Sequence, residues 1–407
     1  MANPNEIQGT EEKMTIQDAE KRIGMVISDI KSNVTEAGLV PELNERGKLE
    51  TVEGVEGYGF NSEMLGYAMR LAIENDDRDL FERLHSGYQL LQGKGSNGLL
   101  RARLHHNLAV DESGNGVESW ADGNQDVALS LLEAGQKWGK QYEEEGIRLA
   151  TAFINSGHIQ EVNGRLCVFN SFAEDQEKYL GERLRLVDLS MWNFRLYERM
   201  QQLQPDEVRW QRLYSTGAEV FTDTLDKFKL PPNRIPLIDG QVVSYEELFQ
   251  KLDGDELLAG SLKVSKEVVA GRLADPYTEH RVYGWDAMRI PYRLADTADP
   301  RLLELSVTLY KRLAEGGNLG VNIQAETGSR ERANTFSPSI APCLTAQICE
   351  QGDISQAIAG LEASMQVEEN KEGVGTFKTP LYWKMWDGLA LSQVRRYYNA
   401  TTSESIT

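Results

Sequence analysis

Apolar residues recur with helical spacing along most of the chain. A stripe from Leu65 to Ile73 follows the i, i+3, i+4, i+7 and i+8 positions of one helix face, and a second stripe runs from Val127 to Trp138. Such stripes build a core. Similar patterns predict further helices at 17–34, 77–92, 142–156, 188–203, 206–228, 244–253, 282–296, 300–316, 337–350, 352–364 and 380–397.

Turn-rich segments separate these helices and pair them into hairpins. Glycine-rich connections lie at 93–98 and at 316–318, and the alternating pattern of strands is scarce. About six hairpins of this size can close into a ring of inner helices wrapped by outer helices, so we expect an all-α (α/α)6 barrel. An open superhelix is the competing architecture, but it normally shows a sequence repeat, and none is evident in this chain.

The domain organisation follows from the same pattern. The length of 407 residues would allow two or three average domains, yet a helical barrel uses this much chain as one unit. We predict one domain over 15–397, between a flexible N-terminal segment 1–14 and a flexible C-terminal tail 398–407. The two longer connections, 159–187 and 229–243, are where a helical scaffold usually carries a binding site.

The charge balance narrows the class of partner. The chain carries 63 acidic and 43 basic residues and a net charge of −20. Because nucleic-acid binding needs a dense basic footprint, we exclude nucleic acid as a partner. No stretch approaches the roughly 20 apolar residues of a membrane span, and the first residues lack the pattern of a secretory signal.

Cysteine and histidine spacing indicates no metal site. Cys167, Cys343 and Cys349 are odd in number and lack ligand spacing, which argues against a disulfide framework and a zinc site. His105 and His106 are adjacent, so they point to different faces of any helix. We expect no metal and no cofactor.

Three acidic residues lie at the starts of predicted helices, each in a segment that also holds an aromatic residue. They are Glu63, Asp122 and Asp286. Acids are common at helix N-termini because they complement the helix dipole, so each of the three has a purely structural interpretation. The alternative is chemical, since two opposed carboxylates over an aromatic-lined groove are what hydrolysis of a glycosidic bond needs.

These segments resemble, in order, the motifs of glycoside hydrolase family 8. Residues 62–69, Ser-Glu-Met-Leu-Gly-Tyr-Ala-Met, are similar to Ser-Glu-Gly-x-x-Tyr-Gly-Met. Residues 120–128, followed by Trp138-Gly139, are similar to Ala-(Ser/Thr)-Asp-(Ala/Gly)-Asp-x-x-(Ile/Met)-Ala ending in Trp-Gly. Residues 285–291, Trp-Asp-Ala-Met-Arg-Ile-Pro, are similar to Tyr-Asp-Ala-x-Arg-x-Pro. Fainter matches at 188–192 and 382–391 extend the resemblance to roughly 15–397.

The resemblance implies a role for each acid. Glu63 would protonate the leaving glycosidic oxygen, Asp286 would activate water on the opposite face, and Asp122 would bind the distorted sugar. Such a pair inverts the anomeric centre, with the two carboxyl groups roughly 6.5–9.5 Å apart. Arg289, one helical turn beyond Asp286, would keep the base ionised. The expected substrate-binding residues are Tyr67, Trp120, Arg289, Trp192 and Tyr283, although Trp120 and Trp192 could equally be packing residues.

The function implied is inverting, endo-acting hydrolysis of a β-1,4-linked polysaccharide, either a cellulose-like glucan or a bacterial exopolysaccharide. The family resemblance further implies a secreted or periplasmic protein, and we expect a monomer.

Departures from the family pattern keep other interpretations open. Met191 stands where the family has a tyrosine, Ala102 where it has a stacking tryptophan, and Asn124 replaces the second aspartate of the signature. Loss of a stacking ring would weaken binding of an unsubstituted glucan. A catalytically impaired, carbohydrate-binding relative is therefore the alternative. A polysaccharide lyase of the same fold would need Tyr/His or Arg chemistry, and no histidine accompanies the three motifs.

Overall fold

The computed structural model describes residues 4–42, 58–92, 97–105, 119–169, 180–315, 319–333, 337–369 and 381–404. The chain forms two compact units, Met1–Leu149 with Phe336–Thr407, and Ala150–Thr335. We describe each unit by itself. The expected single domain over 15–397 stays a prediction.

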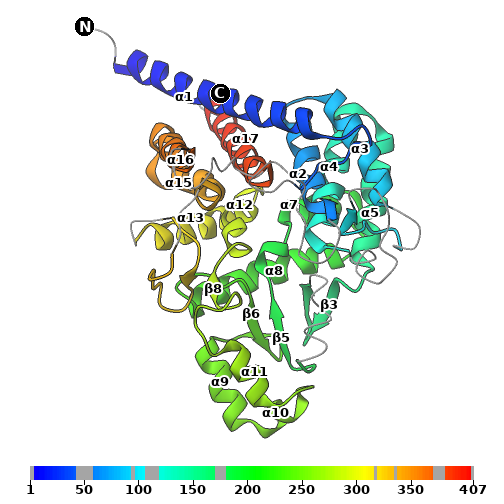
Figure 1. Cartoon of the computed structure of the whole chain (residues 1–407), viewed down its shortest axis with the longest axis vertical. Coiled ribbons are helices and arrows are strands. Elements are labelled where there is room, and N and C mark those ends of the chain that lie inside the picture. Colours follow the sequence, from blue (N-terminus) through cyan, green and yellow to red (C-terminus); the bar gives the residue numbers. More distant parts are fainter. Residues whose placement is uncertain are drawn as a thin grey trace. The chain divides into compact units, whose positions relative to one another are not determined.

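In the part of the first unit that the structure describes, the helices are joined by one short antiparallel strand pair, β1 (Tyr58–Asn61) with β2 (Arg103–His105). Both ends of the chain contribute helices to this unit, and α1 packs against α17 (Figure 1). The helices are α1 (Pro4–Asn33), α2 (Ser62–Glu74), α3 (Arg78–Leu91), α4 (Ala121–Trp138), α5 (Lys140–Ile154, whose last turn enters the second unit), α14 (Ser337–Ile340), α15 (Leu344–Gln351), α16 (Ile354–Glu369) and α17 (Leu381–Glu404).

Helices α2 and α4 lie side by side and run in the same direction. Two glycines allow their backbones to approach closely. A Cβ on Gly66 would lie 2.7 Å from the Cβ of Asp126, and a Cβ on Gly123 would lie 2.2 Å from Ser62 Oγ. Further along, Lys137 Nζ donates to the carbonyl of Ile73 at 2.7 Å. The residue numbers of the contacting pairs increase along both helices, so the two N-termini lie at the same end.

The other helices of this unit cover the α2–α4 pair. Helix α3 packs back on α2, and α5 packs on α4 where Gly135 meets Glu143. Gly388 of α17 fits between Val26 of α1 and Leu71 of α2. The helical periodicity predicted inner helices wrapped by outer helices, and the parallel direction of α2 and α4 was not part of that prediction.

The second unit combines helices with three small antiparallel sheets (Figure 1). Two of its turns, Asn163-Gly164 and Asp239-Gly240, have positive φ at both residues, as tight hairpin turns require. The strands are β3 (Ile159–Val162) with β4 (Arg165–Val168), β5 (Leu184–Val187) with β6 (Ile235–Ile238) and β7 (Gln241–Val242), and β8 (Val282–Tyr283) with β9 (Ile323–Gln324).

The helices of the second unit form two hairpins and a three-helix extension. Helix α7 packs on α8, α12 packs on α13, and α10 and α11 both pack on α9. Their bounds are α7 (Phe194–Leu203), α8 (Arg209–Lys227), α9 (Tyr245–Gly254), α10 (Glu256–Ser261), α11 (Lys266–Leu273), α12 (Ile290–Ala295) and α13 (Pro300–Ala314), with the 3-10 turns η2 (Leu189–Met191) and η3 (Ala287–Arg289).

The structure confirms a predominantly helical chain and corrects several boundaries. The predicted helix 188–203 begins only at Phe194, because Asp188 caps the turn η2 and Trp192 is extended. The predicted helix 282–296 is divided into β8, η3 and α12. Helices α10 and α11 were not predicted.

Helices reach into both chain ends. Helix α1 begins at Pro4 and α17 extends to Glu404, so parts of the segments predicted to be flexible are helical. Their mobility stays a prediction. Among the described residues, no helix is both long and apolar enough to cross a membrane.

Candidate active site

Glu63 lies in the first turn of α2, but it does not cap that helix. The cap is Asn61, whose Oδ1 accepts from the backbone N–H of Met64 at 2.7 Å. This bond satisfies one of the free N–H groups at the helix start, and the Glu63 carboxylate is not the capping group. A negative charge in the first turn still complements the helix dipole, so the structural interpretation of Glu63 stays open beside the chemical one.

Two tyrosine hydroxyls hold Glu63 instead. Tyr67, one turn further along α2, donates to Glu63 Oε1 at 2.5 Å, and Tyr382 of α17 donates to the same oxygen at 2.8 Å. The Tyr67 ring packs edge-on against Trp386, with ring centroids 4.9 Å apart. Because Glu63 is 8% exposed and is held from two helices, its carboxyl group has a fixed orientation.

Asp122 starts α4 next to the start of α2. Its neighbour Gly123 meets Ser62 and the backbone nitrogen of Glu63 so closely that no side chain fits there. Asp122 Oδ1 accepts from the Gly123 N–H at 2.8 Å, so one of its oxygens serves the helix end. The structure thus brings Glu63 and Asp122, which are 59 positions apart by their numbers, to two adjacent helix N-termini.

Asn124 fixes the loop that precedes α4. Its amide donates to Ser119 Oγ and to the carbonyl of Trp120, both at 2.6 Å, and its Oδ1 accepts from the N–H of Leu100 at 2.8 Å. An aspartate could not supply the two donated bonds. This accounts for asparagine at a position where the family signature has aspartate.

Asp286 lies in the second unit and is likewise free of a capping role. Asn233 Oδ1 accepts from the N–H groups of Gly284 and Ala287, at 3.1 and 2.9 Å, and so secures this turn. Arg289 donates to Asp286 Oδ1 at 2.8 Å, and Arg234 donates to Asp286 Oδ2 at 2.9 Å. The structure therefore shows the Arg289 contact that the sequence predicted and adds a second arginine.

A second buried carboxylate shares Arg234. Arg234 Nη1 donates to Asp188 Oδ2 at 2.6 Å as well as to Asp286. Burial raises the pKa of Asp188 to about 6, against the opposing charge of Arg234 and with the help of the Asp286 charge. Burial also acts to raise the pKa of Asp286, but the charges of Arg289 and Arg234 outweigh it and hold that pKa below its ordinary value.

Two of the predicted sugar-binding aromatics belong to the core. Trp192 is fully buried, and its indole N–H donates to the carbonyl of Leu213 at 3.2 Å. Tyr283 is also fully buried, in β8. Both are packing residues in this structure, which corrects the sequence expectation.

Two further residues that were expected to bind sugar contact the candidate acids instead. Tyr67 and Arg289 are buried and bind Glu63 and Asp286, so we assign them to positioning. Trp120 is half-buried, with the Arg103 guanidinium 4.7 Å from its ring centre. Its role in sugar binding stays a prediction.

The two departures from the family pattern are internal. Ala102 and Met191 are each 2% exposed. The backbone carbonyl of Ala102 accepts from the N–H of Ser62 at 2.9 Å, so this segment is tied to the start of α2. A tryptophan at 102 would have to enter a packed site.

Sequence reasoning assigned no site role to several residues that the structure places beside the acids. Tyr382 and Arg234 bind Glu63 and Asp286 directly, and Asp188 joins through Arg234. Trp285 precedes Asp286 and is 39% exposed, unusual for so large an aromatic. Trp285 is adjacent to a candidate acid in the sequence, and Asp188 and Tyr382 begin the two fainter family matches, so only Arg234 lies outside the motifs.

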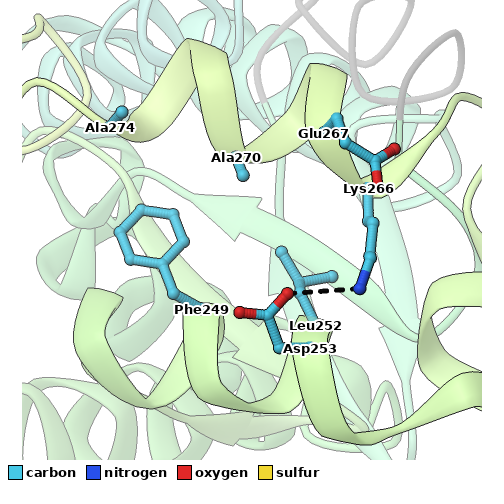
Figure 2. Close-up of a pocket in the computed structure, with 7 residues that line it drawn as sticks. All are labelled: Phe249, Leu252, Asp253, Lys266, Glu267, Ala270 and Ala274. Atoms are coloured by element: carbon cyan, nitrogen blue, oxygen red, sulfur yellow. Dashed lines mark hydrogen bonds and ion pairs between the residues drawn. The ribbon is translucent and has the colours of Figure 1, made fainter.

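The second unit also contains a cavity of about 310 Å³ between α9 and α11, lined by Phe249, Leu252, Asp253, Lys266, Glu267, Ala270 and Ala274. Figure 2 shows Lys266 reaching Asp253, and their charged atoms are 3.2 Å apart. None of the predicted site residues lines this cavity. No cluster of the described residues has the composition of a metal site.

Comparison with known proteins finds a family match for one segment of the chain. Residues 52–175, which carry Glu63 and Asp122, match the model of glycosyl hydrolases family 8. The family resemblance deduced from the three acidic motifs is confirmed. No curated protein sequence matches the chain.

Solved structures match nearly the whole chain at low identity. An endo-1,4-D-glucanase from Vibrio fischeri is 18% identical, with a TM-score of 0.64 over 91% of this chain and 94% of the other. Endoglucanase Cel10 from Klebsiella pneumoniae, a family 8 glycosyl hydrolase, is 14% identical, with a TM-score of 0.59 over 91% and 99%. A β-1,3-1,4-glucanase from Paenibacillus is 15% identical, with a TM-score of 0.63 over 93% and 93%. The (α/α)6 fold class is confirmed.

Proposed function

We propose that this chain, which carries a family 8 segment and an (α/α)6 fold, is an inverting, endo-acting glycoside hydrolase of β-1,4-linked glucans. Glu63 is the general acid, Asp286 is the general base, and Asp122 binds the sugar at the cleavage point. Trp120 and the exposed ring of Trp285 contact the flanking sugars. No cofactor takes part, because a carboxylic acid and a carboxylate suffice for this reaction.

The observation that carries the proposal is the contrast between the two carboxyl environments. Glu63 receives neutral tyrosine hydroxyls, whereas Asp286 is held between two guanidinium groups. An arginine beside a carboxyl group favours its ionised form. Asp286 is therefore suited to accept a proton from water, and Glu63 takes the role of the acid by its place in the family motif.

The substrate follows from the relatives and from the arginines. Solved structures of the same fold include a 1,4-glucanase and a mixed-linkage glucanase. In the sequence, Arg101, Arg103 and Arg289 left room for an anionic polysaccharide, but in the structure Arg103 lies over the Trp120 ring and Arg289 pairs with Asp286. We therefore place a neutral β-glucan ahead of an anionic exopolysaccharide. Secretion and a monomeric state remain predictions from the sequence.

A catalytically impaired, carbohydrate-binding relative is the second candidate. It is favoured by the double pairing of Asp286 with Arg234 and Arg289, since a base must still accept a proton. However, the Asp286 side chain is 25% exposed, so water reaches this carboxylate. A base that is ion-paired but solvent-accessible remains able to act.

A reducing-sugar assay on carboxymethyl cellulose, mixed-linkage β-glucan, xylan and chitosan separates the candidates. The proposal predicts release from at least one of the two β-glucans, and no release by Glu63→Gln or Asp286→Asn. Binding without release by the wild-type protein on all four polymers would favour the impaired relative. Release that persists in both variants would overturn the assignment of the acid and base.

A further inference from the structure

Arg234 joins two aspartates through a single nitrogen atom. Its Nη1 lies 2.6 Å from Asp188 Oδ2 and 2.9 Å from Asp286 Oδ2. The side chain of Asp188 is 6% exposed, that of Arg234 is 12% exposed and that of Asp286 is 25% exposed. Exposure therefore increases from Asp188 through Arg234 to the proposed base.

Further hydrogen bonds fix the members of this cluster in position. Asp188 Oδ1 accepts from the Ser190 N–H at 2.9 Å and from Ser190 Oγ at 2.7 Å. Arg234 also donates to the carbonyl of Asn233 at 2.9 Å, and its own carbonyl accepts from Tyr245 Oη at 2.6 Å. The guanidinium therefore has a set position between two carboxylates, neither of which can move far.

We infer that Arg234 and Asp188 are positioning residues for Asp286, and that the charge on Asp188 sets how strongly Arg234 holds the proposed base. This inference rests on the proposed function of Asp286. An ionised Asp188 competes for the guanidinium and leaves Asp286 more basic. A protonated Asp188 carries no charge to compete for the guanidinium. Arg234 then interacts more strongly with Asp286 and makes Asp286 less basic.

The charged groups around Arg234 are consistent with control of Asp286 by the charge on Asp188. The turns η2 and η3 and helix α12 contact one another. Arg289 on η3 binds the other oxygen of Asp286, buried Arg293 lies on α12, and Glu279 adds a negative charge toward Arg234. Burial raises the pKa of Asp188 to about 6, whereas the pKa of Asp286 is lowered, so the two carboxylates titrate in separate ranges.

Asp188→Asn is the decisive substitution, because the amide keeps Oδ1 as an acceptor for Ser190 while it removes both the titrating charge and the Oδ2 acceptor of Arg234. In protein labelled with ¹³C at the aspartate carboxyl carbons, the Asp286 signal is identified by its absence in Asp286→Asn. We expect this signal in the wild type to show a smaller step near pH 6 and its main step at lower pH. Asp188→Asn should remove the smaller step and leave the main one.

Arg234→Met supplies the opposite perturbation. Loss of the cation should raise the main titration step of Asp286 by about one pH unit or more. If this variant does not fold, the Asp188→Asn titration decides by itself. The control is Asp239→Asn, which disrupts the separate Arg183–Asp239 pair of 2.6 Å in the β6–β7 turn and should leave both steps of Asp286 unchanged.

Activity provides the second readout. The ratio of wild-type to Asp188→Asn kcat should be near one below about pH 5 and rise to several-fold above about pH 7, because only the ionised Asp188 makes the base more basic. A constant ratio across pH, together with an unchanged Asp286 titration, would overturn the inference and leave Asp188 with a structural role. Because the titration needs no substrate, it tests the coupling even if the protein hydrolyses nothing, an outcome that would refute the proposed function separately.

Discussion

Tyr382 donates a hydrogen bond of 2.8 Å to Glu63, although the two residues are 319 positions apart in the sequence. Helix α17 packs against α2 and brings this hydroxyl to the carboxyl group that we assign as the acid. Tyr67 donates to the same oxygen from within α2. The orientation of Glu63 therefore depends on two helices, α2 and α17, which are far apart in the sequence.

Tyr382→Phe tests this dependence. Removing one donor should cost about 1 kcal/mol of positioning, which lowers kcat roughly five-fold and changes KM little. Steady-state kinetics on the best β-glucan measure both constants. Phenylalanine keeps the ring that packs beside Trp383 at a centroid distance of 4.6 Å, so the fold should be unchanged. An unaltered kcat would show that the acid keeps its position without the Tyr382 hydroxyl.

Glu63→Gln should abolish hydrolysis without unfolding the protein. The amide cannot donate the proton that the leaving oxygen requires, while Asn61 continues to cap α2. Circular dichroism and the melting temperature provide the control for folding. A variant that unfolds would instead assign Glu63 a structural role, and full activity would move the acid to another residue.

The pH profile should identify Asp286 rather than Asp188 as the base. The pKa of Asp286 is lowered, so its ionised, active form persists as the pH falls through the ordinary aspartate range and is lost only below it. The acidic limb of kcat/KM should therefore lie below about pH 4. A limb that abolishes activity near pH 6 would match Asp188 and would transfer the role of base to it.

Trp285→Ala tests the exposed aromatic next to Asp286. If the ring stacks on a sugar, its loss should raise KM by several-fold to about tenfold, since a stacked ring contributes on the order of 1 kcal/mol. Leu257→Ala is a matched control, because Leu257 is also a large exposed apolar residue, at 79%, and lies on α10. Equal KM values for the two variants would contradict a stacking role.

Gly123→Ala tests the close approach of α2 and α4. The added Cβ would lie 2.2 Å from Ser62 Oγ and 3.0 Å from the nitrogen of Glu63, so we expect a loss of about 1–3 kcal/mol in stability and reduced activity. Gly24→Ala on α1 is the control, because nothing lies within 4 Å of the position that its methyl group would take and alanine favours a helix. Equal melting temperatures would show that the two helices can separate without cost.

Helical periodicity predicted most of the fold because a core-facing stripe is a local property. It placed α2, α4, α8 and α13 within a few residues of their bounds. It missed α10 and α11, which are short. It also extended one helix back to 188, because the spacing of apolar residues does not show that Asp188 caps a separate turn.

The candidate site was predictable only where partners are close in sequence. Arg289 is three residues from Asp286 and Tyr67 is four from Glu63, so helical geometry suggested these pairs. Arg234 is 52 positions from Asp286, and no local pattern joins them. Trp192 was misassigned to sugar binding because an aromatic residue in a motif carries no information on its burial.

The most direct test of the proposed function is the anomeric configuration of the first product. Proton NMR recorded during hydrolysis of a soluble β-1,4-glucan oligosaccharide would detect the new reducing end before mutarotation. Inversion by Glu63 and Asp286 predicts that the α anomer appears first and that Glu63→Gln and Asp286→Asn give no product. Initial appearance of the β anomer would contradict the account, because it would make the second carboxylate a nucleophile instead of a base.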